Sequence, residues 1–405
     1  MAFSGTYFCL RGYVGGCSFD SCFEGTQVVK KGIDFLFESS GFLIVGSLVA
    51  LVWANMDYHG YEWIVHNQIV HFLVNNVLMA FFFAIAAKEI REAFIPGGAL
   101  SSPRKAMTPI LATVGGMVGP ALIYVGGCAF LARMDLMKGW AIPCATDIAF
   151  SYLVAKMVFG PKHPAIPFLL LLAIVDDGLG LIILATCYPT DAIDPVALMG
   201  LVALGVGLGI FMKNVMRIKS FWAYIGIAGS ISWLGFYHGG IHPALGLVPV
   251  IFVIPHAKVD VGLFEWSESQ KDTLNEFEHW FKNPVELILG AFGLVNAGVA
   301  LGSFSTPTML VLAGLLIGKP LGITLFALIG MTFGLTLPEG MSIRDLITIG
   351  VAASVGFTVA LFVSTVAFPA GETLEAAKMG ALGSFVAFVF TIAVGKILRV
   401  KEAGQ

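Results

Sequence analysis

The sequence contains little charge and no pattern typical of a metal-binding or disulfide-rich protein. Asp, Glu, Lys and Arg make up 12% of the 405 residues, whereas soluble domains contain about 25%. The six cysteines form no C-x-x-C pair and have no metal-ligand spacing with histidine, so we expect them to be small apolar residues in or near helices. The net charge of −3 is uninformative about partners, and we expect neither a cofactor nor a nucleic-acid partner.

Hydrophobic residues dominate instead. They form 57% of the chain, the mean hydropathy is positive, and the 48 glycines suit closely packed transmembrane helices. Runs of ~20 apolar residues predict an all-α integral membrane protein with about twelve transmembrane helices. The candidate spans are residues 40–56, 69–87, 108–131, 139–158, 166–187, 195–212, 220–236, 242–255, 284–302, 306–329, 345–367 and 375–395.

The charge distribution predicts how the chain crosses the membrane. If both termini are cytoplasmic, nearly all Lys and Arg fall in inner loops, and only Arg133 and Lys138 fall in outer ones. Residues 1–37 then form a cytoplasmic tail without a secretory signal peptide, in which 28–37 is either a short surface helix or a solvated lead-in. Residues 38–398 form one transmembrane domain and 399–405 a short cytoplasmic tail. The long inner loop 256–283 is amphipathic enough for a surface helix.

A weak internal symmetry relates the two halves of the chain. The sequence G-P-A-L at Gly119–Leu122 is similar to G-K-P-L at Gly318–Leu321, and an interrupted span follows each. Such a pattern suggests two halves built on one plan, as in transporters with inverted repeats, although chance can also produce it.

Four charged residues lie deep in these spans: Asp147, Asp176, Asp177 and Lys319. A carboxylate at the centre of a span costs at least ~2.5–3.5 kcal/mol on insertion scales, and such charges face the protein interior, form pairs and mark ion paths. The alternative is a helix-to-helix ion pair that only fixes the packing. Three acids and one lysine at one inferred depth favour an ion path.

Two spans carry signals of a break near the middle of the membrane. In G-W-A-I-P-C-A-T-D-I-A-F, Pro143 lacks an amide donor, and Thr146 and Asp147 are good N-cap residues for a second half-helix. In G-V-A-A-S-V-G-F-T-V-A-L-F, Gly356 and Thr358 offer a similar break.

The charged residues can serve such a site in different ways. If the half-helices cross, we expect Asp147 to offset their positive ends and Lys319 their negative ends. Asp176 and Asp177 are neighbours in the sequence, so on a helix their side chains point ~100° apart and cannot both bind one ion in the same way. We expect Asp177 to take the cation and Asp176 to pair with Lys319. Hard oxygen ligands suit Na+, Li+ or a proton.

The sequence resembles the NhaA-type bacterial sodium/proton antiporters in several blocks over roughly residues 38–398: G-W-A-I-P-C-A-T-D-I-A-F, A-I-V-D-D-G-L-G, V-N-A-G-V-A-L, L-L-I-G-K-P-L-G-I, L-P-E-G and V-G-F-T-V-A-L-F. The resemblance implies twelve helices in inverted repeats, with broken fourth and eleventh helices that cross near the ion site, and a homodimer in the bacterial inner membrane. It implies electrogenic exchange of two protons for one Na+ or Li+ by alternating access, in the service of pH homeostasis and salt tolerance. The implied ion and proton residues are Asp176, Asp177, Thr146, Asp147 and Lys319, and the first two would hold the transported cation.

One block departs from the family pattern. Where the family has G-L-E-x-K-R-E at the cytoplasmic end of the second helix, this sequence has A-A-K-E-I-R-E, so Lys88 replaces an acid. That block contributes to the family's pH response, and we therefore expect the response to be shifted or lost. A histidine at a helix start is more often structural than pH-sensing. The residues considered for pH sensing are Lys88, Glu89, Arg91, Glu92, His242 and Glu278.

Three functions other than antiport stay open on the sequence alone. A sensor or scaffold that lost transport is compatible with Lys88, but the intact acids and lysine argue against it. A sodium-coupled symporter would need a pocket for an organic substrate. An intramembrane aspartyl protease, the one enzymatic alternative to a transporter, carries its two acids on neighbouring helices in Y-D and G-x-G-D, and no G-x-G-D occurs here.

Overall fold

The computed structural model describes residues 41–65, 67–95, 98, 100, 103–256 and 272–400, and the regular elements in this part are all helical. The predicted tail 1–37, the last residues of the C-terminal tail and most of the inner loop lie outside the described residues. The elements are α2 (Gly41–Met56), α3 (Tyr58–Val65), α4 (Gln68–Phe72), η1 (Leu73–Leu78), α5 (Met79–Phe94), α6 (Pro103–Phe130), η2 (Met134–Gly139), η3 (Ile142–Cys144), α7 (Ile148–Phe159), α8 (Ala165–Cys187), α9 (Pro195–Asn214), α10 (Phe221–Ala223), η4 (Tyr224–Gly229), α11 (Ser230–His238), η5 (Pro243–Leu245), α12 (Val248–Ile251), α13 (Thr273–Asn296), α14 (Thr306–Ala313), η6 (Gly314–Gly318), α15 (Lys319–Thr332), α16 (Ile343–Ala352), α17 (Phe357–Ala367), α18 (Glu372–Gly383) and α19 (Val386–Ile397).

Most of the predicted spans correspond to apolar helices of spanning length. Among the described residues, 6 helices are long and apolar enough to cross a membrane, or up to 8 if each of two bent pairs is one span. The 6 are Gln68–Phe94, Ala106–Phe130, Ala165–Cys187, Pro195–Asn214, Thr306–Thr332 and Glu372–Ile397. The bent pairs are Met134–Cys144 with Ile148–Phe159 and Ile343–Ala352 with Phe357–Ala367, at 53° and 50°. Both predicted helix breaks are thus present in the structure.

Two of the predicted boundaries are wrong. The span predicted at 242–255 is not a continuous helix but the short elements η5 and α12, because Pro243 and Pro249 each remove a backbone donor. The prediction of a separate surface helix in loop 256–283 is also wrong for the last part of that loop. There, α13 begins at Thr273 and continues into the ninth predicted span as one helix. Asp272 begins that helix by accepting hydrogen bonds of 3.0 Å from the amides of Leu274 and Asn275.

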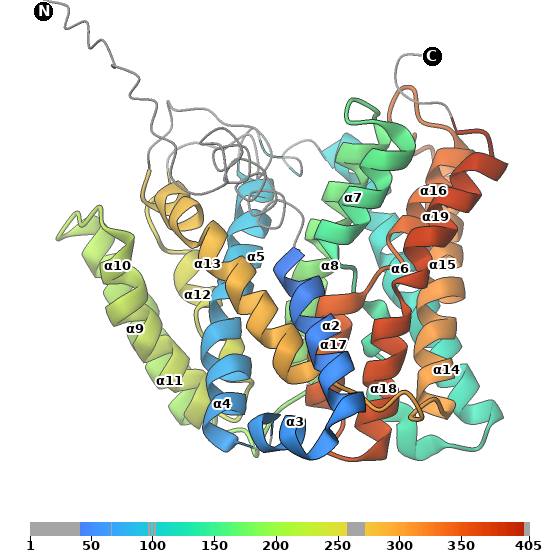
Figure 1. Cartoon of the computed structure of the whole chain (residues 1–405). Coiled ribbons are helices and arrows are strands. Elements are labelled where there is room, and N and C mark those ends of the chain that lie inside the picture. The colour runs from blue at the N-terminus through green and yellow to red at the C-terminus, as the bar shows by residue number, and fades with distance from the viewer. Residues whose placement is uncertain are drawn as a thin grey trace, which may run out of the picture.

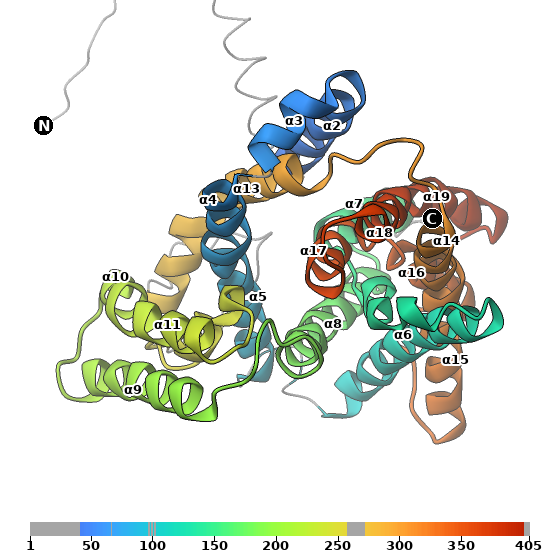
Figure 2. The same cartoon turned by 90° about the horizontal axis from the view of Figure 1, so that it is seen from below.

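The helices form two groups that face each other. In Figure 2, α9, α10 and α11 lie with α4, α5 and α13 on one side, and α6 lies with α14 to α19 on the other. Figure 1 shows α7 and α8 with the second group, and α8 also packs against α5 of the first. The charged residues singled out by the sequence therefore lie in the second group or at its boundary with α5.

The two similar motifs at Gly119 and Gly318 pack directly against each other. A Cβ on Gly119 would lie 2.3 Å from the carbonyl oxygen of Gly318, and a Cβ on Gly318 would lie 2.6 Å from the Cα of Pro120. Glycine at both positions lets α6 approach η6 and α15 backbone to backbone. This close approach holds the start of α15, and hence Lys319, against the centre of α6.

Candidate functional site

Asp147 lies at the first helix break and joins it to the second. It precedes α7 as its N-cap, where its carboxylate accepts a hydrogen bond of 3.4 Å from the amide of Phe150. The other carboxylate oxygen accepts from the Thr358 amide at 3.2 Å and from the Thr358 hydroxyl. Asp147 is thereby bonded to the first turns of both α7 and α17, where unpaired backbone amides collect partial positive charge.

The backbones of the two breaks also meet. The Asp147 amide donates to the carbonyl of Val355 at 2.7 Å. A Cβ on Gly356 would lie 2.8 Å from the carbonyl oxygen of Ala145, so glycine is needed for this approach. The two broken segments are therefore held together as one unit by main-chain contacts as well as by Asp147.

Lys319 is fully buried and bonded to two acceptors. Its Nζ lies 3.1 Å from Oδ2 of Asp176, and it also donates to the carbonyl oxygen of Cys144. Cys144 is the last residue of η3, so the ammonium group meets the negative end of a half-helix. Both side chains of the Lys319–Asp176 pair are buried, at 0% and 2% exposure.

Asp177 is the next residue of α8 after Asp176. It lines a cavity together with Asp176, Ala145, and Phe82 and Ala86 of α5. No hydrogen bond or ion pair to Asp177 is found within the described part of the chain. A half-buried carboxylate without a partner at this depth is costly unless it serves an ion or a proton.

Two further oxygens, one at the first helix break and one in the acid pair, have no hydrogen-bond partner within the described ranges. Thr146 Oγ1 and Asp176 Oδ1 are buried and have no hydrogen-bond partner among the described residues. Together with the Asp177 carboxylate they are hard oxygen donors of the kind that suits a small cation. The described residues hold no group of three or more His, Cys, Asp or Glu placed to bind a metal ion. The side-chain oxygens described here are those of two carboxylates and one hydroxyl.

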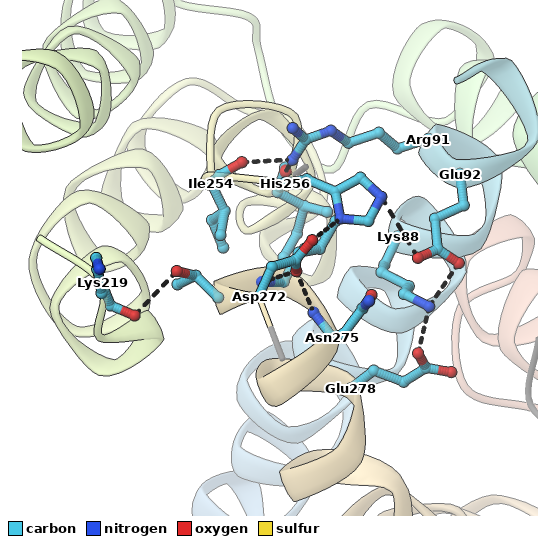
Figure 3. Close-up of polar contacts among 12 residues, drawn as sticks. Lys88, Arg91, Glu92, Lys219, Ile254, His256, Asp272, Asn275 and Glu278 are labelled. Atoms are coloured by element: carbon cyan, nitrogen blue, oxygen red, sulfur yellow. Dashed lines mark hydrogen bonds and ion pairs between the residues drawn. The ribbon is translucent and has the colours of Figure 1, made fainter. Parts of the chain in front are cut away.

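A second polar cluster lies towards the end of α5, near the start of α13 (Figure 3). Lys88 is buried and forms ion pairs with Glu92, at 2.6 Å, and with Glu278. Arg91 donates to the carbonyl oxygens of Ile251 and Ile254 at 2.6 and 2.8 Å and so ties α5 to the end of α12. Lys88 is therefore the shared partner of two acids.

His256 connects this cluster to the start of α13. Its side chain is fully buried, with Nδ1 2.7 Å from Asp272 and Nε2 3.6 Å from Glu92 (Figure 3). Burial lowers the pKa of His256 below its ordinary 6.5, and the nearby Asp272 carboxylate opposes that shift. His256 and Asp272 flank residues 257–271, so this contact joins the two ends of the inner loop.

The sequence matches a family of known proteins. Residues 36–394 match the sequence profile of the Na+/H+ antiporter 1 family. The chain belongs to this family. It is 47% identical over 415 residues to "Na(+)/H(+) antiporter NhaA" of Jannaschia sp. (strain CCS1), which covers 91% of this chain and 98% of that protein. It is 46% identical over 380 residues to the protein of the same name from Desulfitobacterium hafniense (strain DSM 10664 / DCB-2), covering 92% and 97%.

A solved structure is also similar, though only distantly. The sodium proton antiporter MjNhaP1 from Methanocaldococcus jannaschii at pH 8 matches 93% of this chain and 100% of its own at 15% identity and a TM-score of 0.47. The assignment to the Na+/H+ antiporter 1 family rests on the sequence matches alone. With the apolar helices, it makes the chain a multi-pass membrane protein.

In this member of the Na+/H+ antiporter 1 family, the predicted site residues fall into two places. Thr146, Asp147, Asp176, Asp177 and Lys319 gather around the two breaks, and Lys88, Arg91, Glu92 and Glu278 gather at the end of α5. Pro143, Gly356 and Thr358 lie at the breaks as predicted.

Sequence reasoning placed His242 with the pH-sensing candidates, but the structure shows it apart from the cluster at Lys88. Its Nδ1 accepts from the Ala244 amide at 3.3 Å, and its ring lies 4.9 Å from that of Phe362. This is the structural role at a helix start considered for it above.

Two residues of the cluster at Lys88 were missed from the sequence. His256 follows a proline at the end of a predicted span, and nothing in its own neighbourhood distinguishes it. Asp272 carried a usable signal, because an Asp two residues before an apolar position is a typical N-cap.

Proposed function

We propose that this protein exchanges Na+ or Li+ for H+ across the bacterial inner membrane. The observation that carries the proposal is the arrangement of Asp177, an unbonded carboxylate lining a cavity, beside the buried Lys319–Asp176 pair. The names of the related antiporters support the same pair of ions. The proposed transport residues are Thr146, Asp147, Asp176, Asp177 and Lys319.

Competition for one site would couple the two fluxes. Na+ binds the ionised Asp177 with help from Thr146, whereas a proton neutralises that carboxylate and releases the cation. Asp176 exchanges its partner between the transported cation and Lys319, and this Lys319–Asp176 pair takes up the second proton as the cation leaves. Two protons moving against one Na+ transfer one net charge per cycle, which makes the exchange electrogenic.

Alternating access requires the cavity to open to one side at a time. The cavity lies between α5 of one helix group and α8 of the other, where a relative shift of the two groups would change its exposure. We also infer the full family architecture of twelve spans in inverted repeats, with both termini cytoplasmic and a homodimeric assembly. The close packing of the similar motifs at Gly119 and Gly318 supports the two-repeat plan.

We infer that pH regulation differs from that of relatives with an acid at position 88. Glu92 and Glu278 are both engaged by Lys88, so a change in their protonation would also break two ion pairs. Activation by pH would then require this cluster to come apart.

Exchange in proteoliposomes tests the function directly. Purified protein is reconstituted, a pH gradient is imposed, and its collapse is followed after addition of Na+, Li+ or K+ at about pH 6.5 to about 9, a range around neutrality in which histidine and shifted acids titrate. Na+ and Li+ should collapse the gradient, K+ should not, and a membrane potential should change the rate. An absence of exchange with all three ions would contradict the proposal and favour a sensor or scaffold.

A further inference from the structure

The segment between α13 and α14 connects the two helix groups, as Figure 2 shows. Its first part is bonded to α2 and α3, which pack on α13 of the first group. The Asn55 side chain donates to the Val299 carbonyl at 2.9 Å and accepts from the Leu301 amide at 3.0 Å. The Tyr61 hydroxyl of α3 accepts from the Gly298 amide at 3.0 Å. As far as Leu301, the segment is therefore attached to the first group.

The last part of the segment is attached to the second group. The Thr308 hydroxyl accepts from the Ser305 amide at 3.2 Å and donates to the Ala376 carbonyl of α18 at 2.8 Å. Between the two attachments lie residues 302–304. A Cβ on Gly302 would meet nothing within 4 Å beyond its chain neighbours, so packing does not restrain it. A few loop residues of this kind can absorb the change in backbone angles when two packed groups move relative to each other.

Glu375, in the first turn of α18, bridges this crossing point. Its two carboxylate oxygens accept hydrogen bonds from different elements, one from the Tyr58 hydroxyl of α3 and one from the Ser303 hydroxyl, both at 3.0 Å. We call Tyr58, Ser303 and Glu375 the latch. Hydrogen bonds to a carboxylate are roughly twice as strong as those between neutral groups. Because Tyr58 is 42% exposed and Glu375 is partly exposed, the latch can break without uncovering the core.

The latch restrains the helix that forms one wall of the cavity. Near its start, α17 is bonded to Asp147 through Thr358, and it lines the cavity with Val359 and Val363. It then leads through a short turn into α18 and Glu375. Since α5 of the first group also lines the cavity, movement of α17 away from that group would widen the cavity. The bond between Tyr58 of the first group and α18 opposes this movement.

The latch lies at the end of the molecule opposite to the cluster at Lys88. In Figure 1, α3 and α18 lie at the end where α4 leads towards α5, and Lys88 lies in the second half of α5. With both termini cytoplasmic, as proposed above, the Lys88 end faces the cytoplasm. The latch end then faces the outside.

We propose that the latch holds the outer side of the protein closed, and that Glu375 must release Tyr58 before the cavity opens outwards. Loss of the latch shifts the population towards the outward-open arrangement, because the bond exists only in the closed one. Glu375 is a positioning residue in this role, since it acts through α17 and α18 and touches no transported ion. The role rests on the proposed antiport function and adds the contact that controls access from one side.

Removal of one hydroxyl tests the latch in transport. Tyr58→Phe deletes the donor and keeps the ring. The KM for Na+ at the outer face, measured in right-side-out vesicles, should fall about fivefold, because the apparent affinity rises with the fraction of protein open to that face. The KM at the cytoplasmic face, measured in everted vesicles, should stay near that of wild type, since most of the protein remains latched. A contact that only stabilised the fold would lower the melting temperature and leave both KM values unchanged.

Matched variants identify the bond that matters. Glu372→Gln removes an exposed acid from the same turn of α18 and should leave both KM values as in wild type. Glu375→Ala should lower the outer KM as Tyr58→Phe does. Tyr58→Phe should have no further effect on the outer KM in the Glu375→Ala background, because the bond is already absent there. Additive effects of the two substitutions would contradict a direct contact.

A second readout does not depend on transport. Val363→Cys places a thiol in the cavity wall, and a membrane-impermeant maleimide is added to right-side-out vesicles without Na+. Labelling at position 363, followed by peptide mass spectrometry, should be about fivefold faster when Tyr58→Phe is also present. An unchanged labelling rate, or equal changes in KM at the two faces, would overturn the proposal. If wild type exchanges no Na+ but the labelling rate rises as expected, the latch stands and the antiport function fails.

Discussion

Lys319 and Asp176 form a buried ion pair between α15 and α8, with Nζ 3.1 Å from Oδ2. The lysine also donates to the Cys144 carbonyl at the end of η3, so one ammonium group links the first helix break to the acid pair. The other oxygen of Asp176 has no hydrogen-bond partner among the described residues. Asp176 thus binds Lys319 through one carboxylate oxygen and also lines the cavity beside Asp177.

Loss of either partner alone should destabilise the protein more than loss of both. Lys319→Met leaves the Asp176 carboxylate buried without its cation, at a cost of about 3–5 kcal/mol. The double variant Lys319→Met/Asp176→Asn removes both charges and should recover most of the lost thermal stability. Thermal unfolding of the detergent-purified proteins measures this, and equal melting temperatures for the single and double variants would count against the pair.

The hydroxyl of Thr358 should matter because of its bond to Asp147. Thr358→Val keeps the backbone donor but removes the hydroxyl donor from a buried carboxylate, which costs about 1–3 kcal/mol. We expect a lower melting temperature and slower exchange. Thr365→Val is the control on the same helix, since among the described residues its hydroxyl donates to the nearby Phe362 carbonyl, at 2.7 Å. Equal effects of the two substitutions would show that the contact with Asp147 is unimportant.

The approach of the two breaks should depend on glycine at position 356. A Cβ there would lie 2.8 Å from the Ala145 carbonyl oxygen, so Gly356→Ala must push the breaks apart at a cost of about 1–3 kcal/mol. Exchange should fall along with the melting temperature. Gly207→Ala, in α9, where the added carbon meets nothing within 4 Å beyond the adjoining backbone of its own helix, should be neutral or slightly stabilising. A fully active Gly356→Ala protein would contradict the close approach.

His256 should make stability depend on pH in the acidic range. Burial lowers its pKa below 6.5 in the folded protein, so the unfolded chain binds the proton more readily. The stability is thus greatest above about pH 6.5 and falls as the pH decreases through the lowered value. Melting temperatures from about pH 5 to 8 should show this fall in wild type and a weaker one in His256→Gln. His59 is exposed, so the melting temperature of His59→Gln should depend on pH as that of wild type does. If the melting temperature of His256→Gln falls as much as that of wild type, His256 is excluded as the source of the fall.

Much of the site could be predicted because buried charge is costly in a membrane protein. Asp147, Asp176, Asp177 and Lys319 stood out in apolar runs, and the break signals at Pro143 and Gly356 correspond to observed bends. The resemblance to the NhaA-type family is confirmed by the comparisons. The proposed division of roles between Asp176 and Asp177 stays a prediction.

Other features could not be predicted because they depend on contacts distant in sequence. Lys88 stood out in the sequence, but its pairing with Glu278 depends on how α13 packs on α5. The extent of α13 was missed because charged residues at its start masked a helix that continues into an apolar segment. The predicted span 242–255 failed because hydropathy does not register the prolines that interrupt it.

The most direct test of the account is Na+/H+ exchange by Asp177→Asn protein in proteoliposomes, beside wild type at equal reconstitution. The amide keeps the size of the side chain but cannot carry the charge or release the proton. We predict robust Na+-dependent collapse of a pH gradient by wild type and only the background of protein-free liposomes by the variant. Sodium-dependent exchange by Asp177→Asn at a rate near that of wild type would contradict the central claim that this carboxylate carries the transported ion.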